Sequence, residues 1–162
     1  MVARTTNLLF QSPEDTERFA CIMAGYLQNG DALLLSGPVG AGKSHFARTM
    51  IRSLLAHDED IPSPTFTLVQ TYHGKAGYIW HADLYRLSDT LEVVELGLTE
   101  AFSDAICIVE WPDRLGSLAP SNALRVAFSM TANQQEREAQ ISWQAGSWDR
   151  RLETVLTEHA TL

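Results

Sequence analysis

The spacing of apolar residues changes several times along the chain, and each change predicts a new element. Apolar side chains recur three or four positions apart from Ser12, a typical N-cap, to the Asn-Gly stop signal at 29–30, which predicts a helix. The run ALLLS at 32–36 is continuously apolar, as expected of a strand buried on both faces of a parallel sheet. A second amphipathic helix is predicted from 43 to about 56.

The middle of the chain changes to a strand-like pattern. Two β-rich runs, 65–73 and 77–82, are joined by Gly-Lys-Ala-Gly, which predicts an antiparallel hairpin. A helix capped by Ser88 and broken at Gly97 should follow, with a second short helix after it.

The last third combines one buried strand with a second hairpin. AICIV at 105–109 is again continuously apolar, whereas 122–130 and 137–145 alternate between apolar and polar residues. A terminal helix is expected over 148–158. Strands and helices that alternate early and hairpins that come late predict an α/β fold, a mixed β-sheet flanked by helices, in one domain over 1–162.

Composition narrows the partners and the compartment. With 20 acidic and 12 basic residues the net charge is −8, the wrong sign for a protein that holds nucleic acid by itself. No stretch approaches the about 18 apolar residues of a membrane span, and a secretory signal is not expected, so a cytoplasmic protein is predicted. Cys21 and Cys107 lie in apolar surroundings and are expected to be reduced core thiols.

The segment GPVGAGKS, residues 37–44, matches the phosphate loop, or Walker A pattern, G-x-x-x-x-G-K-[ST]. It lies between the predicted strand and helix, where backbone N–H groups and the helix N-terminus can surround a phosphate. Lys43 would reach the β- and γ-phosphates and Ser44 would ligate Mg²⁺. No guanine-reading Asn-Lys-x-Asp motif is present, so ATP is favoured. We expect the loop to bind ATP through Gly37, Val39, Gly40, Ala41, Gly42, Lys43 and Ser44.

Hydrolysis also needs an acid near Ser44, usually at the carboxyl end of a neighbouring buried strand. Glu110 follows AICIV and is predicted to be a catalytic acid and a ligand of Mg²⁺ or of its water. Asp83 follows GYIWHA and is the second candidate catalytic residue. Either residue could instead be a solvated strand end or a helix cap.

Five further segments occur in a specific order after the phosphate loop, and together with it they resemble the TsaE family, also named YjeE. These segments are SPTFTLVQTY (63–72), HADLYRL (81–87), ELGL (95–98), VEWPDR (109–114) and REAQI (137–141). Members are small bacterial ATPases of tRNA threonylcarbamoyladenosine synthesis. The resemblance covers nearly the whole chain and implies a P-loop domain with a mixed sheet and Mg-ATP as ligand. It also implies TsaD and TsaB proteins as partners, with tRNAs reading ANN codons reached only through the complex.

The resemblance also implies roles for individual residues. Asp83 matches the acid of the DLYR motif beside the nucleotide, and Glu110 matches the acid on the Mg²⁺ side. The resemblance also matches Lys43 and Ser44 to phosphate and Mg²⁺ contacts. It assigns Arg137 and Trp111 to nucleotide contacts and Thr65 to a switch-like segment. The chain departs from the family pattern at Pro38-Val39, where Asp-Leu is common, and at Glu136, where Gly is common.

Alternatives remain open from the sequence. A P-loop small-molecule kinase would need an arginine-rich lid, which the chain does not offer, and a nucleotide-dependent binding switch would differ only in turnover. Trp80 and Trp111 could be core residues or ligand contacts, and His81 a satisfied strand-end histidine or a base. Tyr85 and Arg86 could face a partner or pack the next helix, with Arg86 paired to Glu92 or Glu95.

Overall fold

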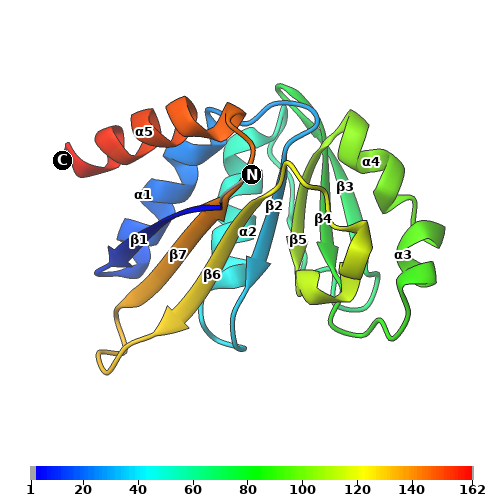
Figure 1. Cartoon of the computed structure of the whole chain (residues 1–162), viewed down its shortest axis with the longest axis horizontal. Helices are drawn as coiled ribbons and strands as arrows, with labels where there is room; N and C mark the ends of the chain where they lie inside the picture. Colours follow the sequence, from blue (N-terminus) through cyan, green and yellow to red (C-terminus); the bar gives the residue numbers. More distant parts are fainter. Residues whose placement is uncertain (1–2, 162) are drawn as a thin grey trace.

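One mixed β-sheet organises the part of the chain that the computed structural model describes, residues 3–161 (Figure 1). Its seven strands lie in the order β1-β7-β6-β2-β5-β4-β3. Strands β6, β2, β5 and β4 are parallel, and the two ends of the sheet are antiparallel. The strands are β1 (Arg4–Phe10), β2 (Ala32–Ser36), β3 (Val69–Gly74), β4 (Gly77–Asp83), β5 (Ile106–Glu110), β6 (Leu124–Met130) and β7 (Arg137–Trp143).

Helices cover both faces of this sheet (Figure 1). One apolar cluster lies under α1 (Pro13–Ala24), α2 (Lys43–Leu54) and α5 (Ser147–Ala160). The other lies under α3 (Thr90–Glu95), α4 (Leu98–Asp104) and the 3₁₀ helix η1 (Pro112–Leu118). This arrangement confirms the predicted α/β fold with a mixed sheet.

The central strand β2 shows why its sequence is apolar throughout. Leu33 and Leu35 belong to the first cluster, whereas Ala32 and Leu34 belong to the second, and all four are fully buried. Successive side chains of a strand point to opposite faces, so both faces must be apolar when helices cover both.

Two sequence predictions about local structure are wrong, and one strand was missed. Residues 65–68 form a turn and not the start of β3, because Leu68 has a left-handed φ of 68° that ends the extended conformation. Helix α3 is capped by Asp89 and not by Ser88: the Asp89 carboxylate accepts the Leu91 N–H at 3.0 Å. Strand β1 was not predicted, since its edge position leaves most of its side chains at least partly exposed.

The cysteine prediction holds for one residue of two. Cys107 is buried in β5, and burial raises the pKa of its thiol to about 12. Cys21 is exposed, which contradicts the prediction. The buried stripe of α1 consists of Thr16, Phe19, Ala20, Met23 and Ala24, and helical geometry turns position 21 away from it. Both thiols are free.

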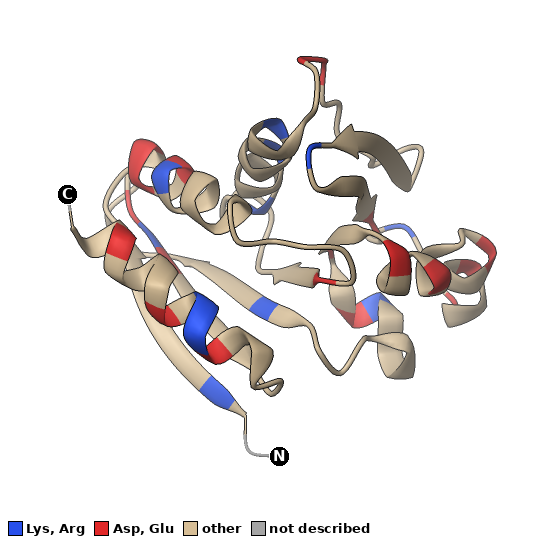
Figure 2. Ribbon diagram, turned by 90° about the horizontal axis from the view of Figure 1, so that it is seen from above, with Lys and Arg blue, Asp and Glu red and all other residues tan. Residues whose placement is uncertain are grey.

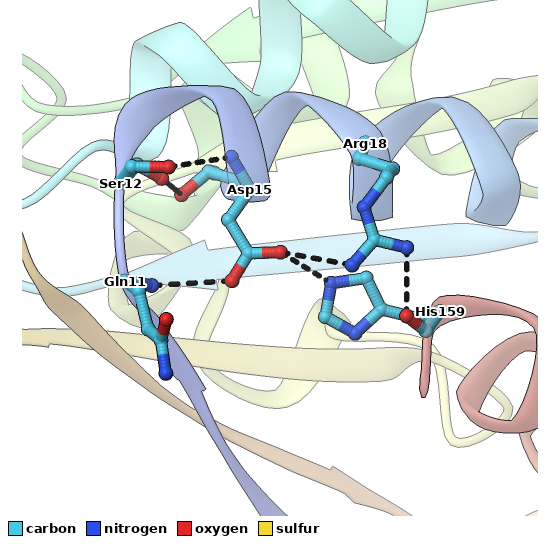
Figure 3. A network of polar contacts seen from close by, with 6 residues as sticks. Gln11, Ser12, Asp15, Arg18 and His159 are labelled. Carbon is cyan, nitrogen blue, oxygen red and sulfur yellow. Dashed lines mark hydrogen bonds and ion pairs between the residues drawn. The ribbon is translucent and has the colours of Figure 1, made fainter. Parts of the chain in front are cut away.

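A polar network fixes the start of α1 against the end of α5 (Figure 3). The Asp15 carboxylate accepts the Gln11 N–H at 3.1 Å and lies 2.9 Å from His159 and 3.2 Å from Arg18. Arg18 also donates to the His159 carbonyl at 2.6 Å, and Ser12 caps the helix. Burial by itself raises the pKa of Asp15, but these hydrogen bonds and positive charges outweigh it and leave the pKa below its ordinary value. The N-terminus of α1 is thereby held beside the cavity described next.

Candidate functional site

The loop between β2 and α2 combines glycine conformations with a close backbone approach. Gly37 has a φ of 132°, and a side chain there would lie 2.5 Å from the carbonyl oxygen of Phe128 in β6. Gly40, at the tip of the loop, has a φ of 85°, and a Cβ added there would meet no atom within 4 Å. Residues with a Cβ rarely adopt either conformation, so these glycines allow the loop to turn tightly into α2.

A cavity of about 660 Å³ opens beside this loop. Its walls come from the start of α1, the loop, the ends of β4 and β5, and the β6–β7 hairpin. The residues that line it are Pro13, Thr16, Val39, Gly40, Gly42, Lys43, Ser44, His45, Thr65, Asp83, Tyr85, Glu110, Trp111, Gln134, Gln135 and Arg137. Of the predicted site residues, Gly37 and Ala41 belong to the loop but do not line the cavity.

Two carboxylates reach the cavity from adjacent strands. Asp83 and Glu110 end β4 and β5 and are paired in register, because the strands are parallel and hydrogen-bonded to each other. Ser44, in the first turn of α2, donates its hydroxyl hydrogen to Glu110 Oε1 at 2.7 Å. The sheet therefore places both predicted acids close to the end of the phosphate loop.

Glu110 is buried, with 1% of its surface exposed, and its other oxygen, Oε2, lies 2.7 Å from His81 Nε2. Burial raises the pKa of Glu110, but hydrogen bonds from His81 and Ser44, together with the charges of His81 and Lys43, outweigh that effect. The net result is a pKa below the ordinary value. Glu110 is thus a carboxylate, able to accept hydrogen bonds and to ligate a cation.

Asp83 is nearly as buried and holds the chain around it. Its two oxygens accept the Tyr85 N–H at 3.1 Å and the Thr65 hydroxyl at 3.2 Å. Its own N–H donates to the Leu68 carbonyl at 2.9 Å. The carboxylate therefore caps a turn and also connects the loop before β3 to the cavity.

Lys43 lies between the loop and an aromatic ring. Its ammonium donates to the carbonyls of Gly37 and Pro38, the latter at 3.2 Å, and lies 4.1 Å from the centre of the Trp111 ring. Burial lowers the pKa of Lys43, and the nearby charges of Glu110 and Asp83 act in the opposite direction without cancelling that effect. Trp111 is therefore a wall of the cavity in contact with Lys43.

The neighbouring aromatic and basic residues divide between core and surface. Trp80 is partly buried and packs against the second apolar cluster. Tyr85 is half-exposed and its ring centre lies 4.9 Å from that of Trp111. Of the two alternatives for Arg86, the pairing with Glu92 or Glu95 is not seen among the described residues: its guanidinium lies 4.5 Å over the ring of Phe66, a side chain that is 80% exposed.

Arg137 joins the second hairpin to the loop. Its guanidinium donates to the Gly40 carbonyl at 3.3 Å, and it is held by the carbonyls of Gln134 and Glu136 at 2.8 and 2.7 Å. A residue nearly 100 positions after the loop in the sequence thus contacts its tip.

Several lining residues were not predicted from the sequence. Thr16 offers a signal, because it is a polar residue within the buried stripe of α1 and only 4% exposed. Pro13, His45, Gln134 and Gln135 carry no such signal: each belongs to a helix start or a hairpin turn of ordinary composition.

The donor set fits a phosphate group and a hard cation. The positive charge of Lys43 and the N-terminus of α2 favour phosphate groups. The oxygens of Ser44 and Glu110 are ligands of the kind that Mg²⁺ prefers. Among residues 3–161 no cluster of three or more His, Cys, Asp or Glu could hold a metal ion. A Mg²⁺ ion at this place would therefore share its coordination among one or two protein oxygens, the phosphates and water.

Comparison with known proteins identifies the family. The family model for "Threonylcarbamoyl adenosine biosynthesis protein TsaE" matches residues 10–139, a segment that includes every lining residue of the cavity. The chain belongs to the TsaE family. This result confirms the resemblance inferred from the order of the sequence motifs.

Individual TsaE proteins are similar over most of their length. The chain is 38% identical over 122 residues to the tRNA threonylcarbamoyladenosine biosynthesis protein TsaE of Rickettsia bellii, which covers 75% of this chain and 85% of the relative. It is 34% identical over 128 residues to the TsaE protein of Bacillus subtilis, with 78% of each chain covered. The crystal structure of Bacillus subtilis YdiB superimposes with a TM-score of 0.79 at 24% identity and 98% coverage of both chains, which shows a shared fold.

Proposed function

We propose that this protein binds Mg-ATP in the cavity and hydrolyses it to drive a TsaD/TsaB-type complex in threonylcarbamoyl modification of tRNA. The modified adenosine would be the one beside the anticodon of tRNAs that read ANN codons. One observation carries the proposal: two buried carboxylates, Asp83 and Glu110, meet the Lys43-Ser44 end of a phosphate loop at one edge of the sheet. Membership of the TsaE family supports the tRNA pathway.

Each residue has a role that follows from its position. A bound Mg²⁺ would neutralise charge that develops on the phosphates during hydrolysis. Ser44 and Glu110, which already share a hydrogen bond, would hold it directly or through water. Lys43 would leave the loop carbonyls for the phosphate oxygens, and Arg137 would approach them from the second hairpin.

Asp83 is the better placed of the two acids to orient the attacking water. Glu110 accepts the hydroxyl of Ser44, the other predicted Mg²⁺ ligand. The oxygens of Asp83 instead accept the Tyr85 N–H and the Thr65 hydroxyl. Asp83 lines the same cavity from the neighbouring strand and is linked to the segment at Thr65, which could respond to the nucleotide. We therefore assign Glu110 to the metal side and Asp83 to the water side.

The surface is consistent with tRNA being handled by the partners. Acidic residues are spread over the helices on both sides of the sheet, with basic residues scattered among them (Figure 2). Together with the net charge of −8, this distribution disfavours direct binding to the phosphates of tRNA. No helix within 3–161 is long and apolar enough to cross a membrane. We place the activity in the cytoplasm, with hydrolysis slow alone and accelerated by the complex.

The test is ATP hydrolysis by the wild type with and without TsaD and TsaB. The partners should raise the rate, and Glu110→Ala should remove the increase, whereas the matched control Glu153→Ala, at an exposed carboxylate of α5, should retain it. An unchanged rate together with no complex by size-exclusion chromatography would refute the proposal. If Glu110→Ala binds ATP and still supports tRNA modification, the protein is a binding switch in which turnover is not required.

A further inference from the structure

His81 lies behind Glu110 and outside the cavity. It is fully buried in β4, and its Nε2 atom is 2.7 Å from Glu110 Oε2. Its Nδ1 atom is buried and has no hydrogen-bond partner among the residues that the structure describes. Because a carboxylate can only accept, Nε2 carries the hydrogen of the His81–Glu110 bond.

This bond determines how Glu110 presents itself to the cavity. The carboxylate has two oxygens: Oε2 is held by His81 from inside the protein, and Oε1 accepts the hydroxyl of Ser44. A glutamate side chain has three rotatable bonds, so a free carboxylate could turn either oxygen away from Ser44. With Oε2 held, only Oε1 remains directed at the cavity.

The buried, unpaired Nδ1 atom of His81 indicates that this residue does more than fill the core. Its neighbours on the same face of the sheet, Ile79 in β4 and Ile108 in β5, are fully buried aliphatic residues of the first apolar cluster. An aliphatic residue at 81 would pack there and leave no buried nitrogen unpaired, but it would leave Glu110 Oε2 without its donor. His81 also cannot act as a base, because it has no exposed surface and does not line the cavity.

We propose that His81 is a positioning residue that holds Glu110 in the orientation needed for Mg²⁺. The inference rests on the proposed function, because it assumes that Mg²⁺ is bound beside Ser44. Residues that orient a metal ligand typically change metal affinity by about 10–100-fold when they are replaced. His81 should therefore affect the Mg²⁺ requirement of nucleotide binding and leave Mg²⁺-free binding unchanged.

The experiment uses His81→Leu, which fills similar space without a donor, and His81→Gln, whose amide can still donate to Glu110. Binding of a non-hydrolysable ATP analogue is measured by calorimetry across a Mg²⁺ titration and again in EDTA. For His81→Leu the Mg²⁺ concentration at half-saturation should rise by about tenfold or more. His81→Gln should stay near the wild type, and all three proteins should bind the analogue equally in EDTA.

A wild-type Mg²⁺ midpoint in His81→Leu would overturn the inference, as would equal shifts in the Leu and Gln variants. If His81→Leu does not fold, His81→Asn takes its place, because its amide is one methylene too short for the same contact. Gln and Asn variants with the same midpoint then overturn the inference. A wild type whose analogue binding does not respond to Mg²⁺ refutes the proposed function itself and the inference with it.

Discussion

Gly37 offers a prediction whose magnitude follows directly from the structure. In Gly37→Ala the new Cβ would lie 2.5 Å from the carbonyl oxygen and 3.2 Å from the Cβ of Phe128, and its backbone would keep a φ of 132°. The nearest atom belongs to the backbone of β6, which is paired with both β2 and β7 and so cannot move aside without strain.

Two costs combine at this position. The conformation costs a residue other than glycine about 1–3 kcal/mol. Relief of the overlap adds about 1–3 kcal/mol, as for other insertions into packed structure. The free energy of unfolding should therefore fall by about 2–6 kcal/mol, and each of those kcal/mol lowers Tm by roughly 2–4 °C in a domain of this size.

Gly40→Ala is the matched control. Gly40 also has a positive φ, 85°, but no atom lies within 4 Å of the Cβ that alanine would add. The free energy of unfolding of Gly40→Ala should fall only by the cost of the left-handed conformation, about 1–2 kcal/mol. Since Gly40 lines the cavity, its new methyl group should instead weaken ATP-analogue binding. Urea unfolding measures both stabilities, and equal losses in the two variants would refute the reasoning.

Three further predictions concern an acid of the site and two ion pairs. Asp83→Asn should lower partner-stimulated ATP hydrolysis by about 10²-fold or more. Binding of the ATP analogue and Tm should stay near the wild-type values. Full activity would show that Asp83 only caps the turn at Tyr85. Arg151→Met should lower the free energy of unfolding, measured in urea, by about 3 kcal/mol. The Asp31 carboxylate lies 2.6 Å from the Arg151 guanidinium and is 7% exposed, so the variant leaves it buried without its partner. No change would show that the pair contributes nothing. Asp15, whose pKa in the folded protein lies below its ordinary value of 3.8, stabilises the fold above that value and loses this contribution as pH falls through the folded pKa. Urea unfolding of Asp15→Asn should therefore show a loss at pH 7 that disappears toward pH 2, and parallel pH profiles would contradict this assignment.

The elements that the sequence predicted best are those with strong local patterns. The doubly buried strands β2 and β5 and the amphipathic helix α2 were predicted within about two residues, because their side chains alone show which faces are covered. Strand β1 was missed, since an edge strand that pairs with a partner more than 125 residues away needs little apolar surface of its own. The exposure of Cys21 was misjudged for a related reason: an apolar neighbourhood in sequence does not say which side of a helix a residue occupies.

For the site, the sequence supplied the chemical groups but not all of their neighbours. The phosphate loop and the two strand-end acids were recognisable because each follows an apolar strand, and the structure brings them together at one cavity. For His81 the sequence left open a satisfied strand-end histidine or a base, and the structure buries it in β4 with its Nε2 atom beside Glu110. That its partner is Glu110 could not be predicted, because the contact depends on β4 and β5 being adjacent.

By itself the sequence determined the class of fold, the phosphate loop, its two candidate acids and the family, since these depend on residue types and on spacing along the chain. Tertiary structure alone decided the strand order β2-β5-β4, which places Glu110 beside Ser44 and Asp83 beside Glu110. It also brought Arg137 from the β6–β7 hairpin to the tip of the loop. The physical reason is that segments distant in the sequence bury their apolar faces together, and this shared burial decides which strands are neighbours. No single stretch of the sequence specifies it.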